Sequence, residues 1–175
     1  MTSAPHRSSD PVAEQAADAG AIDPLTLDEQ VCFAMVVASR ALLGVYRPIL
    51  VPLGLTHPQY LVMLALWQHG PVSVRTLADL LFLDPPTLSP LLKRLEQAGL
   101  LERRRHPADD RQLAVTLTDQ GLALRRQALE VPGAVVDGLD LDLATLTELR
   151  TLLHRVIAGA GRRAPAAPIG GVDHV

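Results

Sequence analysis

The sequence predicts a mainly α-helical protein that contains a winged helix-turn-helix, and three observations lead to this fold class. Hydrophobic residues make up 48% of the 175 residues but aromatic ones only 3%, so the core is rich in Leu, Ala and Val, as in many helical proteins. Over residues 73–117, two short helical segments precede an apolar strand, an Arg-rich turn and a second strand. Longer helical patterns at residues 27–50 and 143–160 enclose this stretch.

Size and composition exclude several classes of protein. The chain is long enough for one domain with tails. No apolar run reaches the roughly 18 residues that a membrane span needs, and no basic segment followed by an apolar one begins the chain. We therefore expect no membrane partner and no signal peptide. Because Cys32 is the single cysteine, an intrachain disulfide is excluded, and these features together point to the cytoplasm.

The charges are unevenly distributed. A formal net charge of −3 by itself argues against a nucleic-acid-binding protein. Between Lys93 and Arg111, however, six basic residues accompany four acidic ones, which leaves a local excess of two positive charges. A basic tip on an acidic body favours a specific regulator over a protein that coats DNA without specificity.

The two ends of the chain are predicted to be tails. Residues 1–25 are rich in Ala, Ser, Pro and Asp without periodicity and are expected to be disordered, and residues 162–175 are expected to be flexible. The domain between them, 26–161, is predicted to begin with a helix over 27–50. A capping box of Thr26 and Glu29 would start this helix, and Pro48 and Pro52 would end it.

Cap residues predict four further helices. Each follows a Thr, Ser or Asp whose side chain can accept a hydrogen bond from the backbone of the next turn. These caps are Thr56 before residues 57–69, Ser73 before 74–81, Thr118 before 119–129 and Asp142 before 143–160. The segment Val131-Pro132-Gly133 is expected to interrupt the chain after the third of them.

The second helix of the helix-turn-helix has two candidate starts. Asp84 followed by Pro85 resembles a cap, but Pro90 would then lie inside the helix and clash with the carbonyl four residues earlier. A start at Thr87 places Pro90 in the first turn, where no backbone donor is lost. We therefore predict a helix over 87–98, ended by Gly99.

This helix supplies the first candidate DNA contacts. Its leucines recur at helical spacing and are expected to face the core. The polar side chains that remain are Thr87, Ser89, Lys93 and Arg94. Hydroxyl and cationic side chains contact both base edges and phosphates. An ordinary solvated helix face is the alternative interpretation.

The wing supplies the second set of candidate contacts. Its strands are predicted over 100–105 and 112–117, joined by residues 106–111. Asp109 and Arg111 lie two residues apart on this turn, so the carboxylate can hold the guanidinium in place for a narrow minor groove. Arg104 belongs to a run of three arginines, some of which must point to phosphate or solvent. A solvated, charged hairpin is the alternative.

The long helices at 27–50 and 143–160 flank the winged helix, which is expected over 58–117. Their natural use is a homodimer interface, because DNA readers of this type span two half-sites of an inverted repeat. The alternative is that the two helices cover one another within a monomer.

The segment LLKRLEQAGLLERRRHPADDRQLAVTLTDQG, with its D-x-R wing followed by L-T-x-x-G, resembles the winged-helix core of MarR-type regulators. Within that family, LTLDEQVC, LFLDPPTLSPLLKRLE and ALEVPGA resemble the organic hydroperoxide resistance regulators. The resemblance covers about residues 25–160. It implies a homodimeric repressor that contacts double-stranded DNA through residues 87–96 and Arg111, holds no cofactor and senses peroxide at Cys32. With one cysteine, it implies that the oxidised sulfur is capped by a low-molecular-weight thiol or over-oxidised.

In general, a lone cysteine on an apolar helix is a small core residue, and a sensor needs groups that stabilise the thiolate. Cys32 lies six residues after the predicted cap, too far for the helix dipole to suffice. The resemblance supplies Tyr46, which matches a family tyrosine that hydrogen-bonds the reactive sulfur. Fourteen residues of helix span about 21 Å, so this tyrosine must come from the partner subunit, with the two helices antiparallel.

His57 departs from the family pattern, which usually has Y-P-Q-Y where this chain has H-P-Q-Y. A histidine can donate to a thiolate, and when protonated it stabilises the thiolate further, in a pH-dependent way. Poorer sensing, a different signal, or a plain surface residue are the other interpretations. Tyr60, the last residue of the motif, is expected in the core.

The sequence therefore predicts a repressor that releases an inverted-repeat operator when an organic hydroperoxide oxidises Cys32. A MarR-type repressor relieved by a bound phenolic or lipid ligand, with Cys32 structural, is the first alternative. A thiol peroxidase-like enzyme is disfavoured because no second cysteine or suitable Arg, Thr or Glu motif accompanies Cys32. A winged-helix module that no longer binds DNA is the remaining alternative. No metal site is predicted.

Overall fold

The computed structural model describes residues 23, 25–106 and 109–161, and side chains within these ranges except those of residues 105–113 and 161. Nearly all of the predicted N-terminal tail and the whole of the C-terminal tail lie outside the described residues. The chain divides into two compact units between Ala41 and Leu42. The described chain is mainly helical with one three-stranded antiparallel sheet, which confirms the predicted winged helix-turn-helix.

The first long helix, α1 (Val31–Leu50), begins four residues later than predicted. A separate 3₁₀ turn, η1 (Leu27–Glu29), precedes it, and the extended backbone of Gln30 divides the two. The side chain of Thr26 forms no cap hydrogen bond, so the predicted capping box is wrong. At the other end Pro48 lies inside the last turn of α1, and Pro52 falls in the next 3₁₀ turn, η2 (Val51–Leu53).

By length and composition, one stretch of the described chain is apolar enough to cross a membrane: Val31–Leu53, with a mean hydropathy of 1.5. The sequence expectation considered uninterrupted apolar runs only, and Arg40 and Arg47 interrupt this stretch. An arginine near the centre of a membrane span costs about 2.5–3.5 kcal/mol. The stretch is weak evidence for a membrane segment, because apolar helices that pack against protein meet the same criteria.

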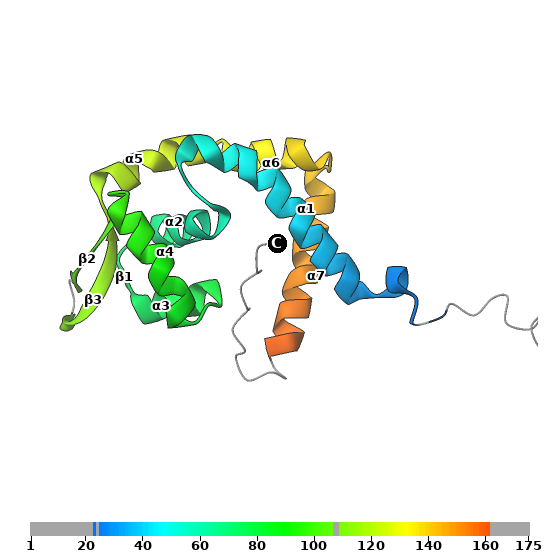
Figure 1. The fold of residues 1–175 in the computed structure, drawn as a ribbon, viewed down its shortest axis with the longest axis horizontal. Coiled ribbons are helices and arrows are strands. Elements are labelled where there is room, and N and C mark those ends of the chain that lie inside the picture. Colours follow the sequence, from blue (N-terminus) through cyan, green and yellow to red (C-terminus); the bar gives the residue numbers. More distant parts are fainter. Residues whose placement is uncertain (1–22, 24, 107–108, 162–175) are drawn as a thin grey trace, which may run out of the picture. The chain divides into compact units, whose positions relative to one another are not determined.

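The winged helix lies wholly in the second unit. Its helices are α2 (His57–His69), α3 (Val74–Leu81) and α4 (Pro85–Gln97), and Figure 1 shows them beside the sheet. The predicted caps of α2 and α3 are confirmed: Thr56 forms a capping box with Gln59, and the Ser73 hydroxyl accepts a hydrogen bond from the N–H of Thr76 at 3.0 Å.

The start of α4 corrects the prediction of Thr87. Asp84 is the cap, because its carboxylate accepts a hydrogen bond from the N–H of Thr87 at 3.1 Å. Pro85 occupies the first helical position, where no N–H is needed. Pro90 is therefore inside the helix with its ring exposed. The cap and the complete burial of Leu88 offset the unfavourable proline.

The second wing strand is longer than predicted, and the first has the predicted length but lies one residue later. They are β2 (Leu101–His106) and β3 (Asp109–Leu117), paired antiparallel with a shift in register between Arg105 and His106. The sequence did not predict β1 (Val72–Ser73), which pairs with the other edge of β3. The sheet order is β1-β3-β2. Because β1 has only two residues, it has no alternation of apolar and polar residues that could predict a strand. Only its pairing with β3 defines it.

Three helices follow the sheet: α5 (Asp119–Ala128), α6 (Val131–Leu139) and α7 (Leu143–Gly161). The predicted caps of α5 and α7 are confirmed, since Thr118 accepts from the N–H of Gly121 and Asp142 from that of Thr145. The sequence did not predict α6, because Pro132 indicated a break. A proline in the first turn is compatible with a helix, and α6 starts there.

Candidate DNA-binding surface and redox site

The exposed face of α4 carries the predicted DNA contacts of the helix-turn-helix. Leu88, Leu92 and Leu95 are fully buried, and α4 packs against α2, α3 and β2 through this side. The opposite side presents four exposed polar residues, Thr87, Ser89, Lys93 and Arg94. Within the described residues, no carboxylate forms an ion pair with Lys93 or Arg94, so both cations are available to a ligand.

Two ion pairs hold the base of the wing. Glu102 lies 2.7 Å from Arg104, and Glu96 of α4 lies 3.7 Å from Arg103. The side chain of Arg104 is 70% exposed, and exposed pairs of this kind contribute little free energy, so a phosphate can replace Glu102 as its partner. Asp109 and Arg111 lie on β3 and not on the turn as predicted. Their side chains fall outside the described ones, so their pairing stays a prediction.

Cys32 is exposed and is the second residue of α1. Its position differs from the prediction because the helix begins after Gln30, whose carbonyl accepts the N–H of Ala34 at 3.1 Å. The first turn of a helix presents unpaired N–H groups and the positive end of the dipole, which favour a negative charge. The sequence interpretation therefore placed Cys32 too far from the start of its helix.

Tyr46 and His57 come together in the second unit. Their ring centroids lie 4.7 Å apart in an edge-to-face arrangement, and Tyr60 lies 6.0 Å from Tyr46. Burial raises the pKa of Tyr46, so its hydroxyl stays protonated and able to donate. Burial lowers the pKa of His57, so its ring is mainly neutral near pH 7. As expected, Tyr60 is in the core, and it is 3% exposed.

The lowered pKa of His57 predicts a pH dependence of stability. Below the ordinary value of 6.5 the unfolded chain binds a proton at this ring more readily than the folded protein does, so the free energy of unfolding decreases as the pH falls. We expect that decrease, between about pH 7 and pH 5, to be larger for the wild type than for His57→Gln. Urea unfolding followed by circular dichroism measures it, and parallel curves for both proteins would contradict the prediction.

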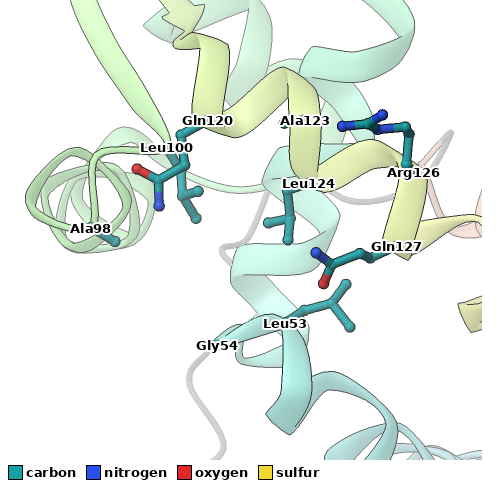
Figure 2. Close-up of a pocket in the computed structure, with 9 residues that line it drawn as sticks. All are labelled: Leu53, Gly54, Ala98, Leu100, Gln120, Ala123, Leu124, Arg126 and Gln127. Carbon is teal, nitrogen blue, oxygen red and sulfur yellow. The ribbon is translucent and has the colours of Figure 1, made fainter.

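A groove of about 570 Å³ in the second unit is lined by residues of η2, of the segment that follows α4, and of α5. Figure 2 shows Leu124 and Gln127 of α5 pointing toward Leu53, with Leu100 and Gln120 at the other end. Its lining combines leucines with side-chain amides, which suits an amphipathic small molecule. None of the predicted site residues lines it. Among the described residues, no three His, Cys, Asp or Glu side chains gather so that they could hold a metal ion.

Comparison with known proteins places the chain among transcriptional regulators. The family model "MarR family" matches residues 55–113. The organic hydroperoxide resistance transcriptional regulator of Bacillus subtilis (strain 168) is 36% identical over 135 residues, which are 77% of this chain and 92% of that protein. The HTH-type transcriptional regulator TtmR of Methylorubrum extorquens (strain PA1) is 42% identical over 142 residues, 77% of this chain and 73% of that protein.

Solved structures agree with this assignment. Reduced AbfR bound to DNA matches with a TM-score of 0.58 and 35% identity, covering 75% of this chain and 95% of that one. AbfR comes from Staphylococcus epidermidis. The curated relatives are named as regulators, in agreement with the expectation that the chain is not an enzyme.

Proposed function

Because the chain belongs to the MarR family, we propose that it is a homodimeric cytoplasmic repressor that releases its operator when an organic hydroperoxide oxidises Cys32. The observation that carries the sensing part is the exposed thiol in the first turn of α1. Similarity to an organic hydroperoxide resistance regulator supports the choice of oxidant.

The winged helix is the proposed DNA reader. Thr87, Ser89, Lys93 and Arg94 of α4 enter the major groove, where hydroxyl and cationic side chains contact bases and phosphates. Arg104 contacts phosphate, and Arg111, supported by Asp109, reaches the minor groove. A structural neighbour bound to DNA supports this assignment.

Apolar side chains exposed on α1 and α7 support the homodimer. On α1 they are Val31, Phe33, Met35, Val36 and Val37, and on α7 they are Leu149, Leu152, Leu153, Val156 and Ile157. Contiguous exposed apolar surface is typical of an interface, and a second copy of the chain is the partner that an inverted-repeat operator requires.

Oxidation at Cys32 proceeds in two steps, formation of a sulfenic acid and then of a mixed disulfide. The thiolate attacks the outer oxygen of the hydroperoxide, an S–O bond forms while the O–O bond breaks, and an alcohol leaves after taking up a proton. A low-molecular-weight thiol then attacks the sulfenic acid, so a mixed disulfide forms and water leaves. The added bulk and polarity in an apolar interface shift the two α4 helices out of register with the operator.

Tyr46 and His57 are the proposed donors to the sulfur of the partner subunit. Both residues lie on one unit with their rings in contact. A sulfur from the partner subunit that comes close to one ring is therefore also close to the other. The fourteen-residue separation along α1, about 21 Å, is the reason for assigning them to the opposite protomer. Since His57 is mainly neutral near pH 7, Tyr46 is the principal donor, and protonated His57 contributes only in acid.

Operator release by peroxide tests the proposal. A duplex selected by the wild-type protein from a random-sequence pool serves as the probe. We expect cumene hydroperoxide with free cysteine to abolish binding by the wild type and to leave Cys32→Ser bound, because serine has no oxidisable sulfur. Gel-shift titration measures both. Equal release of the two proteins would overturn the sensing role of Cys32.

A repressor relieved by a non-covalent ligand is the second candidate, and the groove between η2 and α5 favours it. A phenolic or lipid ligand would lie over Leu53 and Leu124, with the amides of Gln120 and Gln127 as hydrogen-bonding partners. This candidate predicts that Cys32→Ser responds to its effector as the wild type does.

A further inference from the structure

Phe82 adopts a backbone conformation that phenylalanine disfavours. It ends α3 in the left-handed region, with φ 53° and ψ 38°. The N–H of Phe82 donates to the carbonyl of Asp79 at 3.3 Å, and that of Leu83 to the carbonyl of Ala78 at 3.0 Å. This closing turn favours glycine, because a Cβ atom is strained there. Among described non-glycine residues only Asp140 shares a positive φ, and aspartate tolerates it.

The Phe82 ring does not contribute to the core either. Its flanking residues, Leu81 and Leu83, are partly buried and pack against the core, whereas Phe82 is 67% exposed. A glycine would form the turn with less strain, and a polar residue would be better solvated. Neither the turn nor the core accounts for an aromatic side chain at this position.

The location of Phe82 indicates what it contacts. It precedes the cap of α4, Asp84, by two residues, next to the exposed Pro85 and Pro86. The N-terminal end of the second helix approaches the base edges when a helix-turn-helix docks in the major groove. The apolar feature of that groove is the C5 methyl group of thymine, which phenylalanine can contact.

We propose that Phe82 reads a thymine by packing its ring against the C5 methyl group at one position of each operator half-site. This contact rests on the proposed DNA-binding function and adds a specificity residue outside the polar face of α4. The contact adds to operator affinity by burying apolar surface and involves no phosphate. Its contribution to the affinity should therefore not depend on salt concentration.

The test compares Phe82→Gly with the wild type on the operator that the wild type selects from a random-sequence duplex pool. Glycine removes the ring and relieves the backbone, so the melting temperature should equal or exceed that of the wild type. The operator dissociation constant should rise about fivefold, the factor expected for one or two methyl-sized groups. Leu122→Ala, which truncates an exposed leucine of α5, is the matched control and should bind normally.

Replacing operator thymines one at a time by deoxyuridine removes single methyl groups. We expect one position in each half-site to weaken wild-type binding about fivefold and to leave Phe82→Gly unaffected. Normal binding by Phe82→Gly, or equal losses in both proteins at every position, would overturn the contact while leaving the DNA-binding function intact. If the wild type selects no sequence, the proposed function fails and the contact fails with it.

Discussion

Gly121→Ala should lower the free energy of unfolding by about 3 kcal/mol or more, because a side chain at this position collides with backbone. A Cβ atom on Gly121 would lie 2.0 Å from the carbonyl oxygen of Leu100. Three hydrogen bonds prevent either segment from moving away. They are Thr118 N–H to Leu100 O at 3.2 Å, Gly121 N–H to Thr118 Oγ1 at 3.1 Å, and Trp67 Nε1–H to Gly121 O at 2.9 Å.

Urea unfolding followed by circular dichroism measures this loss. Gly133→Ala is the matched control, since a Cβ atom there meets nothing within 4 Å. That substitution lies in α6 and should raise stability by up to about 1 kcal/mol, as glycine disfavours a helix interior. A Gly121→Ala protein as stable as the wild type would show that α5 and the wing are not locked together in this way.

Local signals account for the parts of the fold that the sequence predicted. The caps at Thr56, Ser73, Thr118 and Asp142 are chemistry within one turn, and each introduces the expected helix. Two misses have different causes. Strand β1 exists only because β3 lies beside it, and nearby residues do not predict it. The start of α4 was misplaced although its local signal, Asp84 followed by Pro85, was recognised, because the cost of Pro90 inside the helix was given too much weight.

Some features of the candidate site were also predictable from local sequence patterns, and others were not. Helical periodicity sufficed to separate the buried leucines of α4 from Thr87, Ser89, Lys93 and Arg94. Tyr46 lies on α1 and His57 on α2, with the turn η2 between them in the chain. The spacing of the two residues alone does not predict that their rings are in contact. The placement of Cys32 in a first turn depends on the extended backbone of one residue, Gln30, which no pattern in the sequence indicated.

The proposed dimer predicts a second large effect, on α7. Leu149, Leu152, Leu153, Val156 and Ile157 recur at intervals of three or four residues and are all exposed in the single chain. They form one stripe along the helix. Leu153→Glu would bury a carboxylate in the interface of two such stripes, and a buried unpaired charge is strongly unfavourable. We expect this variant to be a monomer.

Loss of the dimer should weaken operator binding about 100-fold, because two linked half-site contacts become one. Light scattering during gel filtration should give a mass of 18.8 kDa for Leu153→Glu and twice that for the wild type. Thr151→Glu places the same charge two residues away, on the opposite side of α7, and should remain dimeric with normal affinity. If Leu153→Glu were still a dimer, α7 would not be in the interface. Leu153 is 37% exposed in the single chain, and a glutamate at this position is tolerated only if the dimer leaves it in contact with water.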